Sequence, residues 1–397
     1  MKFLIQIPQL IFGGAEKVLV SFANDLVSRG HEVEILEIYE KGLLRPQFDS
    51  RVTFHAICSK EYTQKYYASL SEIRQTKGFG KIQKLCKLMF SKIVGYRRFA
   101  EFLTAQYYRG TQYDAAINYL EIESPTFLKK HIKANKYIQW YHTDVANLDH
   151  PEDTDKMIPA FEKMDAIICV AESAKKSFIE RYPQLAGKTH VIYNFFDAEA
   201  IRRMGDEPFS YHDDRFIMLS VGRMTPQKKY LRFLDVLARL KGDGYSFVWH
   251  VLGTGIEYDA IVEKIHTLGL EDCVVLDGLT DNPYKYMKNC DLFVLPSGWE
   301  GFPTVTMEAK ILGCAVLATD VSGIREQIVH GETGWICENS EEGIYEGVKH
   351  LITSSKIHLK LRDSIGMERI CDPEKKYIKF FSVYGKEISN EHNIFKR

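Results

Sequence analysis

The stretch CDLFVLPSGWEGFPTVTMEAKILGCAVLATDV, residues 290–321, decides the fold. Two apolar runs, LFVL and AVLAT, enclose a glycine-containing loop and a segment long enough to form a helix. Short apolar runs separated by helical segments are typical of parallel strands joined by crossover helices. The stretch therefore predicts one strand–helix–strand unit of an α/β protein.

The same alternation extends over most of the 397 residues. The other predicted strands are FLIQIP, VEILEIY, VTFHAI, DAAINYL, YIQWYH, DAIICVA and HVIYNF in the first half, and FIMLSVGR, FVWHVLG, CVVLDGL and GWICE in the second. We expect two Rossmann-like domains, residues 1–200 and 201–375, followed by a C-terminal helix and tail at 376–397. Ligands bind beyond the carboxyl ends of parallel strands, so the cleft between two such domains is the expected site.

Composition excludes several classes of protein. A content of 45% hydrophobic and 26% charged residues is typical of a folded, soluble chain. The eight cysteines are scattered without a Cys-x-x-Cys pair, which predicts a reducing cytoplasm and no structural metal. The apolar start of the chain is interrupted by Gly13 and Gly14, well short of a membrane span.

The net charge of −1 does not point to any class of partner, and we expect no nucleic acid to bind. One segment, however, is strongly basic. Residues 60–109 contain eleven Lys or Arg against three Glu, and residues 81–98 predict a basic amphipathic helix. Its lysines are Lys81, Lys84, Lys87 and Lys92. Such a helix lies on an anionic membrane or faces a polyanionic acceptor, or it packs on its own domain with solvated lysines. Both interpretations stay open.

Two glycine-containing turns suggest phosphate binding. Gly13 and Gly14 precede a helix expected from about Ala15 to Arg29, where free backbone amides favour an anion, although the glycines can equally serve a tight turn. After the strand that ends at Val221, Gly222 and Arg223 lead into TPQKK. Arg223 and Lys228 could direct two charges at one diphosphate, with Lys229 as the competing lysine.

A third glycine pair resembles a dinucleotide-binding fingerprint but does not complete it. Gly253 and Gly255 lie between a strand and a helix, whereas Tyr258 occupies the position of the third glycine. We interpret this segment as a glycine-rich turn beside the same site.

Glu300 and Glu308 lie on either side of a helix start expected near Pro303 or Thr304. Gly301 allows close backbone approach, and the amides of residues 302–305 form the positive end of the helix. A diphosphate on these amides would leave Glu308 to accept hydrogen bonds from ribose, and Glu300 to face the group beyond the phosphates. Two carboxylates can also form a glycosidase pair, but a position inside a helix beside a phosphate-binding turn suits binding better.

The segment EGFPTVTME resembles the E-x7-E motif of retaining glycosyltransferases of the GT-B type, family 4. Similar segments are GGAEKVLVSFANDLVSRGHEVEI, VGRMTPQK, VLGTG, and the run from GLTDNPYKYMKNCDLFVLPS through EGFPTVTMEAKILGCAVLATDVSGIREQIVHGETG. The resemblance covers nearly the whole chain, loosely between residues 55 and 110. One departure is Tyr230, where members often carry a glycine or a small residue.

The resemblance implies a role for each matching residue. Catalytic roles fall to Glu300, which holds the donor sugar, to Arg223 and Lys228, which neutralise the diphosphate, and to His142, beside the sugar. The implied donor-binding residues are Gly14, Gly222, Lys229, Gly253, Gly278, Leu279, Gly301, Phe302, Pro303, Thr304, Val305 and Glu308, with Gly278 and Leu279 near the base. The C-terminal helix is expected to pack back on the first domain.

The expected function is therefore a cytoplasmic glycosyltransferase that retains anomeric configuration and needs no metal or other cofactor. It would move a hexose-type sugar from a nucleotide diphosphate sugar, with UDP favoured and GDP possible, to a glycan or lipid-linked acceptor. Cell-surface polysaccharide assembly at the inner face of the membrane would suit such an enzyme. The alternatives are an epimerase or sugar phosphorylase of the same fold, and a non-catalytic subunit of a transferase complex.

Overall fold

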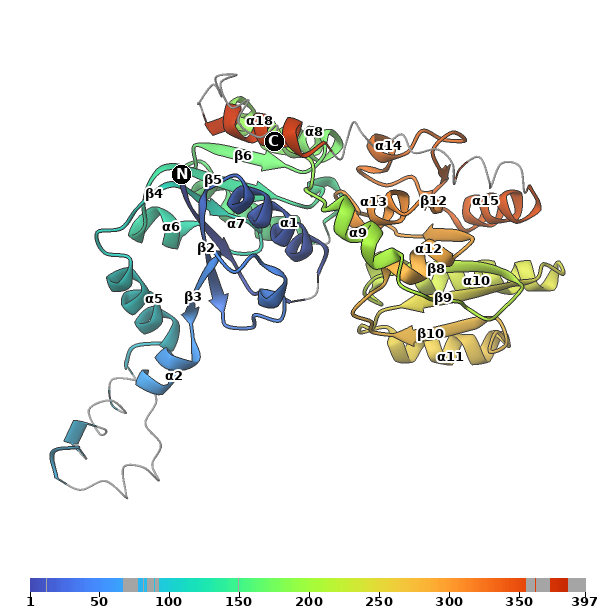
Figure 1. The fold of residues 1–397 in the computed structure, drawn as a ribbon, viewed down its shortest axis with the longest axis horizontal. Helices are drawn as coiled ribbons and strands as arrows, with labels where there is room; N and C mark the ends of the chain where they lie inside the picture. The colour runs from blue at the N-terminus through green and yellow to red at the C-terminus, as the bar shows by residue number, and fades with distance from the viewer. Residues whose placement is uncertain are drawn as a thin grey trace. The chain divides into compact units, whose positions relative to one another are not determined.

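The computed structural model describes residues 1–11, 13–66, 78–80, 82–83, 89, 93–148, 150–354, 361 and 372–384 (Figure 1). Over these residues the strands form one seven-stranded and one six-stranded sheet. The strands are β1 (Lys2–Ile7), β2 (Glu32–Tyr39), β3 (Thr53–Cys58), β4 (Gln112–Asn118), β5 (Lys133–Tyr141), β6 (Ala166–Cys169), β7 (Thr189–Val191), β8 (Phe216–Val221), β9 (Phe247–Leu252), β10 (Val274–Gly278), β11 (Leu292–Leu295), β12 (Ala315–Thr319) and β13 (Trp335–Cys337).

Both sheets have the doubly wound order of Rossmann-like domains. The first runs β3-β2-β1-β4-β5-β6-β7, and the second runs β10-β9-β8-β11-β12-β13. Neighbouring strands are parallel, as in the registers Ile5↔Ile35 and Phe293↔Val316. The strand order reverses between β1 and β4 and between β8 and β11, which is where such sheets bind ligands. The predicted class, two Rossmann-like parallel sheets, is confirmed, and each predicted apolar run forms one strand.

Helices follow most of the strands, as crossover connections require. They are α1 (Gly14–Ser28), α2 (Lys60–Tyr66), α5 (Tyr96–Tyr107), α6 (Thr126–His131), α7 (Pro151–Phe161), α8 (Glu172–Arg181), α9 (Ala198–Gly205), α10 (Tyr230–Gly242), α11 (Tyr258–Leu268), α12 (Tyr284–Asn289), α13 (Thr304–Ile311), α14 (Ile324–Gln327), α15 (Glu341–Thr353) and α18 (Pro373–Tyr384). Short 3-10 turns are η1 (Arg45–Gln47), η2 (Val145–Asn147), η3 (Pro183–Lys188) and η4 (Pro226–Lys228).

Contacts within the chain divide it into two compact units. Unit 1 comprises Met1–Tyr141, His150–Ile168 and Gln184–His190; unit 2 comprises His142–Asp149, Cys169–Pro183 and Val191–Arg397. Three stretches that precede residue 200 therefore belong to unit 2: His142–Asp149, Cys169–Pro183 and the start of the segment Val191–Arg397. The predicted boundaries at residues 200 and 375, and the packing of the C-terminal helix, stay predictions.

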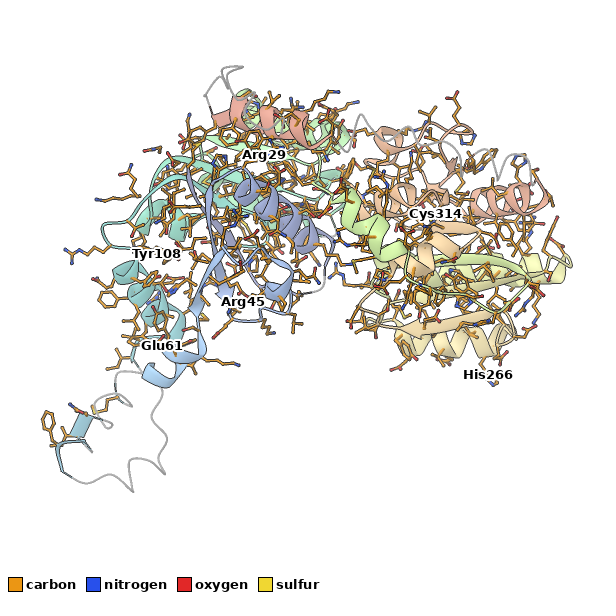
Figure 2. The ribbon with its side chains drawn as sticks, in the orientation of Figure 1. Arg29, Arg45, Glu61, Tyr108, His266 and Cys314 are labelled. Atoms are coloured by element: carbon orange, nitrogen blue, oxygen red, sulfur yellow. The ribbon has the colours of Figure 1, made fainter. Side chains whose placement is uncertain are left out.

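Unit 1 is built around its sheet. On α1, Phe22 packs against Trp140 of β5 at a ring-centroid distance of 5.1 Å. A buried cluster that includes Leu36, Ala100 and Phe127 joins the sheet to α2, α5 and α6. At β2, the fully buried Glu37 pairs with Arg45, labelled in Figure 2, at 2.5 Å. Burial of apolar side chains from sheet and helices supplies most of the stability of such a unit.

The carboxyl ends of three neighbouring strands of unit 1 carry amides. Gln6 of β1 donates to Asn118 of β4 at 2.9 Å, and Asn118 donates to Gln139 of β5 at 2.8 Å. Asn118 also donates to the backbone oxygens of Leu120 and Glu123. All three amide side chains are fully buried. The network therefore fixes the loop after β4 with neutral hydrogen bonds.

Unit 2 packs helices on both faces of its sheet. Trp249 of β9 contacts Phe233 of α10 at 4.9 Å, within a buried cluster that includes residues of α11 and α15. The next residue, His250, points to the opposite face, where its ring packs against Tyr211 and its Nδ1 donates to Asp277 Oδ2 at 2.9 Å. On α18, Lys376 donates to the backbone oxygen of Asn194 within the same unit.

The predicted basic helix falls largely outside the described residues. Its four lysines, at positions 81, 84, 87 and 92, are not among those that the structure describes. Residues 385–397 are outside them as well. In the part of the chain that is described, no helix has the length and apolar character needed to cross a bilayer.

Candidate active site

The loop between β8 and α10 presents the predicted basic residues. Arg223 is exposed, and within the described residues it forms no ion pair. Pro226 opens the 3-10 turn η4, and Lys229 follows it with φ of 54° and ψ of 33°, in the left-handed region. This turn directs the two adjacent lysines differently: the Lys229 Nζ lies 5.4 Å from the centre of the Trp299 ring, whereas Lys228 turns toward Glu300.

Lys228 and Glu300 form a nearly buried ion pair. The Lys228 Nζ lies 2.7 Å from Glu300 Oε1, and the side chains are only 13% and 9% exposed. Glu300 Oε1 also accepts from the Ser297 hydroxyl at 2.7 Å, and Glu300 Oε2 accepts from Gln227 Nε2 at 3.3 Å. Two predicted site residues that are 72 positions apart are thus brought together. Charge-assisted bonds of this kind fix the position of the carboxylate.

Sequence reasoning missed the residues that hold the loop before Glu300. Arg232 of α10 donates to the Pro296 oxygen at 2.8 Å, and Thr319 donates to the Ser297 oxygen at 2.6 Å. Asn339 donates to the Gly298 oxygen at 2.8 Å, and Gln227 donates to the Trp299 oxygen at 3.0 Å. No local pattern marks these side chains, because their partners are backbone oxygens far along the chain. Burial lowers the pKa of Arg232.

Helix α13 begins where the sequence predicted. Pro303 is its N-cap residue and no side chain caps it, so the first amides of the helix remain available to a ligand. Behind it, Gln327 donates to the Pro303 oxygen at 3.1 Å and accepts from Thr306. This buried contact fixes the start of the helix from the side.

Glu308 lies one turn into α13 and is 4% exposed. Its Oε1 accepts a 3.3 Å hydrogen bond from the hydroxyl of Tyr284 on α12. Burial, together with the charge of Glu308, raises the pKa of Tyr284, so that this hydroxyl stays protonated and able to donate. Tyr284 is a further residue that the sequence did not indicate.

The predicted glycines allow three loops to approach closely. A Cβ on Gly253, where φ is +147°, would lie 2.0 Å from the Gly222 oxygen, and one on Gly255 would lie 2.2 Å from the Met224 oxygen. The Gly253 amide donates to the Gly278 oxygen at 2.7 Å. The carboxyl ends of β8, β9 and β10 therefore meet through backbone, as the interpretation of a glycine-rich turn requires. Leu279, just beyond, is 75% exposed.

Gly301 allows a close approach by the segment that carries His142. A Cβ on Gly301 would lie 2.0 Å from the His142 oxygen and 3.0 Å from the Thr143 Cα. His142 belongs to unit 2, so the structure places it beside the loop of Glu300 within one unit. Gly14, the other predicted diphosphate residue, is the first residue of α1 and belongs to unit 1.

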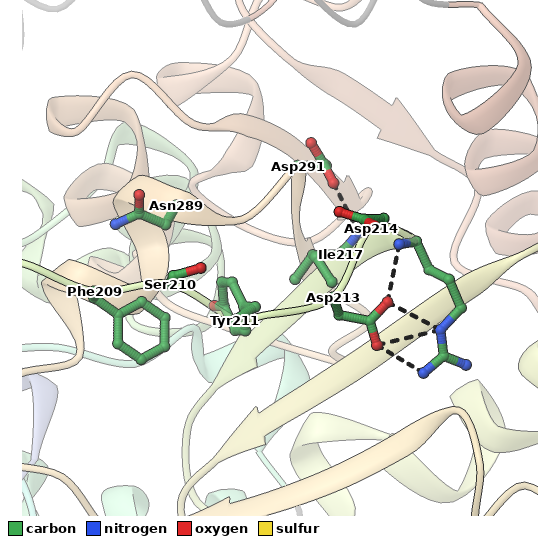
Figure 3. Close-up of a pocket in the computed structure, with 9 residues that line it drawn as sticks. Phe209, Ser210, Tyr211, Asp213, Asp214, Ile217, Asn289 and Asp291 are labelled. Atoms are coloured by element: carbon green, nitrogen blue, oxygen red, sulfur yellow. Dashed lines mark hydrogen bonds and ion pairs between the residues drawn. The ribbon is translucent and has the colours of Figure 1, made fainter.

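A pocket of unit 2 lies at the opposite end of its sheet from the Lys228–Glu300 pair. The pocket in Figure 3 has a volume of about 270 Å³ and is lined by Phe209, Ser210, Tyr211, Asp213, Asp214, Arg215, Ile217, Asn289 and Asp291. Ile217 is at the amino end of β8, opposite to Gly222. Hydrogen bonds from Arg215 lower the pKa of Asp213 to about 2, and Asp291 accepts from the Ile217 amide. The carboxylates of Asp213 and Asp291 therefore hold the backbone and the guanidinium beside them.

A metal-binding group is not found among the residues that the structure describes: no three His, Cys, Asp or Glu side chains there converge on one point. Four polar side chains do converge: Lys228, Glu300, Ser297 and Gln227. Such a group is suited to hydrogen-bonding a polar, anionic ligand.

Part of the sequence matches a known family, and the fold matches solved structures. Residues 206–366 match the model of the family described as "Glycosyl transferases group 1". The crystal structure of Anabaena HepE in complex with UDP and glucose superposes with a TM-score of 0.72 at 16% identity, covering 97% of this chain and 100% of that one. The fold is GT-B. A point mutant of S. aureus TarM, in complex with fondaparinux, alpha-GlcNAc-glycerol and UDP, shares this GT-B fold with a TM-score of 0.75 at 14% identity, covering 97% of this chain and 100% of that one.

Two relatives are similar in sequence to about half of this chain. The N-acetylgalactosamine-N,N'-diacetylbacillosaminyl-diphospho-undecaprenol 4-alpha-N-acetylgalactosaminyltransferase of Campylobacter jejuni is 33% identical over 199 residues, 50% of this chain and 53% of that protein. The capsular polysaccharide biosynthesis glycosyltransferase CapM of Staphylococcus aureus is 28% identical over 191 residues, 47% of this chain and 48% of that protein. The chain thus spans about half the length of both relatives.

Proposed function

We propose that the chain is a retaining glycosyltransferase of family 4 that uses a nucleotide diphosphate sugar, with UDP as the favoured nucleotide. The observation that carries the proposal is the Lys228–Glu300 pair beside the uncapped amino end of α13. It combines a cation for the diphosphate, free amides for its oxygens and a carboxylate for sugar hydroxyls. Bound UDP in the HepE and TarM structures, which share the fold, supports the same choice of donor.

The proposed chemistry uses charges that the chain itself supplies. When the anomeric C–O bond breaks, negative charge develops on the leaving β-phosphate and positive charge on the sugar. Arg223, Lys228 and the first amides of α13 would stabilise the leaving group, and removal of one such donor typically slows catalysis by about 10²–10³-fold. We infer that these cations serve in place of a divalent metal.

Retention of configuration is proposed to occur without a covalent intermediate on the protein. The acceptor hydroxyl would attack from the face that the diphosphate leaves, and its proton would pass to the β-phosphate. Glu300 would hold sugar hydroxyls, with His142 beside the sugar, while Glu308 would accept hydrogen bonds from ribose. Gly278 and Leu279 would contact the base, and Gly14 the diphosphate.

The acceptor is proposed to be a glycan or a lipid-linked glycan of a cell-surface polysaccharide. The names of the two sequence relatives, an undecaprenol diphosphate-linked glycan transferase and a capsular polysaccharide enzyme, support this class. The basic segment 81–98 would bring such an acceptor, or the anionic inner face of the membrane, to the enzyme.

The first test is a calorimetric titration of the full chain with UDP, GDP, ADP and CDP, with EDTA and again with Mg²⁺. We expect one nucleotide, UDP, to bind equally well in both conditions. Glu308→Gln should weaken it by about 10–100-fold, the worth of a hydrogen bond to a charged group. The matched control is Glu332→Gln, an exposed residue on unit 2, which should bind like wild type.

Four outcomes would count against the proposal. If no nucleotide binds, the donor site is wrong and a non-catalytic subunit becomes the better interpretation. If binding requires Mg²⁺, the built-in cations are insufficient. Release of free sugar from UDP-sugar without an acceptor would favour an epimerase, and dependence on inorganic phosphate would favour a phosphorylase.

A further inference from the structure

The carboxylate of Glu326, on α14, accepts four hydrogen bonds. Its Oε1 accepts from the Ser173 amide at 2.9 Å and the Ser173 hydroxyl at 2.7 Å. Its Oε2 accepts from the Glu172 amide at 2.8 Å and the Tyr193 hydroxyl at 2.9 Å. All these residues belong to unit 2. The two donating amides are the first two of helix α8, so Glu326 caps a helix that lies about 150 residues earlier in the chain.

Helix α8 has no cap of its own. Its N-cap residue is Ala171, which has the extended conformation typical of a capping residue, φ −149° and ψ 154°, but no side-chain acceptor. A carboxylate at a helix amino end satisfies its amides and complements the helix dipole. Glu326 therefore supplies from α14 the acceptor that residue 171 lacks.

The same carboxylate is linked to the candidate donor loop. Tyr193, which donates to Glu326, packs its ring against Phe302 at a centroid distance of 5.5 Å and an interplanar angle of 40°. The neighbouring Gly323 donates to the Ser173 hydroxyl at 3.0 Å. A Cβ on Gly323 would lie 2.7 Å from the Gly301 oxygen and 3.0 Å from the Phe302 Cα. The loop of Gly301 and Phe302 is thus supported on one side by Tyr193, which Glu326 holds directly, and on the other by Gly323, which Glu326 holds through Ser173.

We propose that Glu326 is a positioning residue for the donor-binding loop 300–304. It does not reach the donor itself; it fixes Tyr193 and the backbone at Gly323, and these fix Phe302 and Gly301. The inference rests on the proposed function, because it assigns to the loop the task of binding a nucleotide diphosphate.

Replacement by glutamine tests the carboxylate sharply. Each oxygen of Glu326 faces one backbone N–H and one hydroxyl, so Glu326→Gln sets its NH2 against a backbone N–H of α8 whichever way the amide is oriented, because only the hydroxyl can turn to accept. We expect UDP, measured by calorimetry on the full chain, to bind about tenfold more weakly. The melting temperature should fall by about 2–4 °C through loss of the cap. Glu332→Gln is the control and should change neither quantity.

Two further variants separate positioning from capping. Ala171→Ser in the Glu326→Gln background gives α8 a cap of its own and should restore the melting temperature while UDP binding stays weak. Tyr193→Phe removes only the hydroxyl that binds Glu326, and should weaken UDP binding without loss of melting temperature; it also serves if Glu326→Gln does not fold.

The outcomes distinguish the two proposals. If wild type binds no nucleotide, the proposed function fails. If wild type binds UDP but Glu326→Gln and Tyr193→Phe bind it equally well, the positioning role fails alone. Recovery of both stability and UDP binding by Ala171→Ser would reduce Glu326 to a helix cap and would also overturn the inference.

Discussion

The carboxyl ends of the central strands differ in chemistry between the two units. In unit 1, Gln6, Asn118 and Gln139 form a chain of neutral amides that is fully buried. In unit 2, the equivalent edge holds an ion pair, Lys228 with Glu300, that is nearly but not fully buried.

This difference agrees with the proposal that the edge of unit 2 binds a charged ligand. A buried amide network fixes loop backbone without the cost of desolvating charge. A buried ion pair is weak evidence for stability, because the desolvation of two charges often exceeds their attraction. Its presence at the edge of the second sheet is therefore consistent with the proposed binding role, whereas the amides of Gln6, Asn118 and Gln139 in unit 1 serve to hold loop backbone.

The largest expected effect comes from breaking the ion pair. Lys228→Met leaves the Glu300 carboxylate without its cation, and should lower the free energy of unfolding by about 3–5 kcal/mol. Denaturant unfolding measures it, with Lys241→Met as control: Lys241 pairs with Asp272 at the surface, so its loss should cost less than about 1 kcal/mol. Equal losses in both variants would mean that the Lys228 pair is screened like a surface pair.

The second effect tests the amide network of unit 1. Asn118→Leu keeps the branched shape but leaves the Gln6 amide and the Leu120 and Glu123 oxygens without this partner, so the free energy of unfolding should fall by about 2–3 kcal/mol. UDP affinity should not change. A loss of UDP binding that exceeds the loss of stability would contradict the division of roles between the two edges.

A smaller effect is expected from filling the close contact at Gly301. Gly301→Ala places a methyl group against the His142 oxygen, and should cost about 1–2 kcal/mol of stability together with weaker UDP binding. The control is Gly187→Ala, where the added Cβ meets no atom within 4 Å. Calorimetry measures the UDP affinity of both variants, and thermal unfolding measures their stability. If Gly301→Ala matches the control in both, the loop shifts freely.

The smallest effect on stability should come from Arg223. It is exposed and forms no ion pair with the described residues, so Arg223→Met should change the free energy of unfolding by less than about 0.5 kcal/mol. UDP affinity should nevertheless fall about tenfold, through loss of one charged contact. The exposed Arg202 on α9 is the control, since Arg202→Met should change neither quantity. Unchanged UDP affinity in Arg223→Met would remove this residue from the proposed site.

Short sequence patterns predicted the fold well, because each strand is marked by its own run of apolar residues. Each apolar run, such as FIMLSV at β8 or LFVL at β11, is buried on both faces of a parallel sheet and so reads as a continuous hydrophobic stretch. The start of α13 after Pro303 was likewise predicted from the residues around it. The basic helix at 81–98 lies largely beyond the described residues and stays a prediction.

The candidate site was predicted only in part. Glu300 and Glu308 could be named from one segment, and Lys228 from another, but nothing in the sequence chose between Lys228 and Lys229. In the structure Lys229, which has a left-handed backbone conformation, lies near the Trp299 ring, and Lys228 faces Glu300. Which of the two contacts a diphosphate stays a prediction.

The sequence by itself determined the order of strands and helices, the parallel class of both sheets and the glycine positions, because these follow from periodicity and from the absence of a side chain. Only the tertiary structure decided which distant groups meet. No local sequence pattern marks three such contacts: Arg232 with the Pro296 oxygen, Tyr284 with Glu308, and Glu326 with the start of α8. Their partners are backbone groups or single side chains far along the chain, and a hydrogen bond has meaning only once packing has brought its donor and acceptor to about 3 Å.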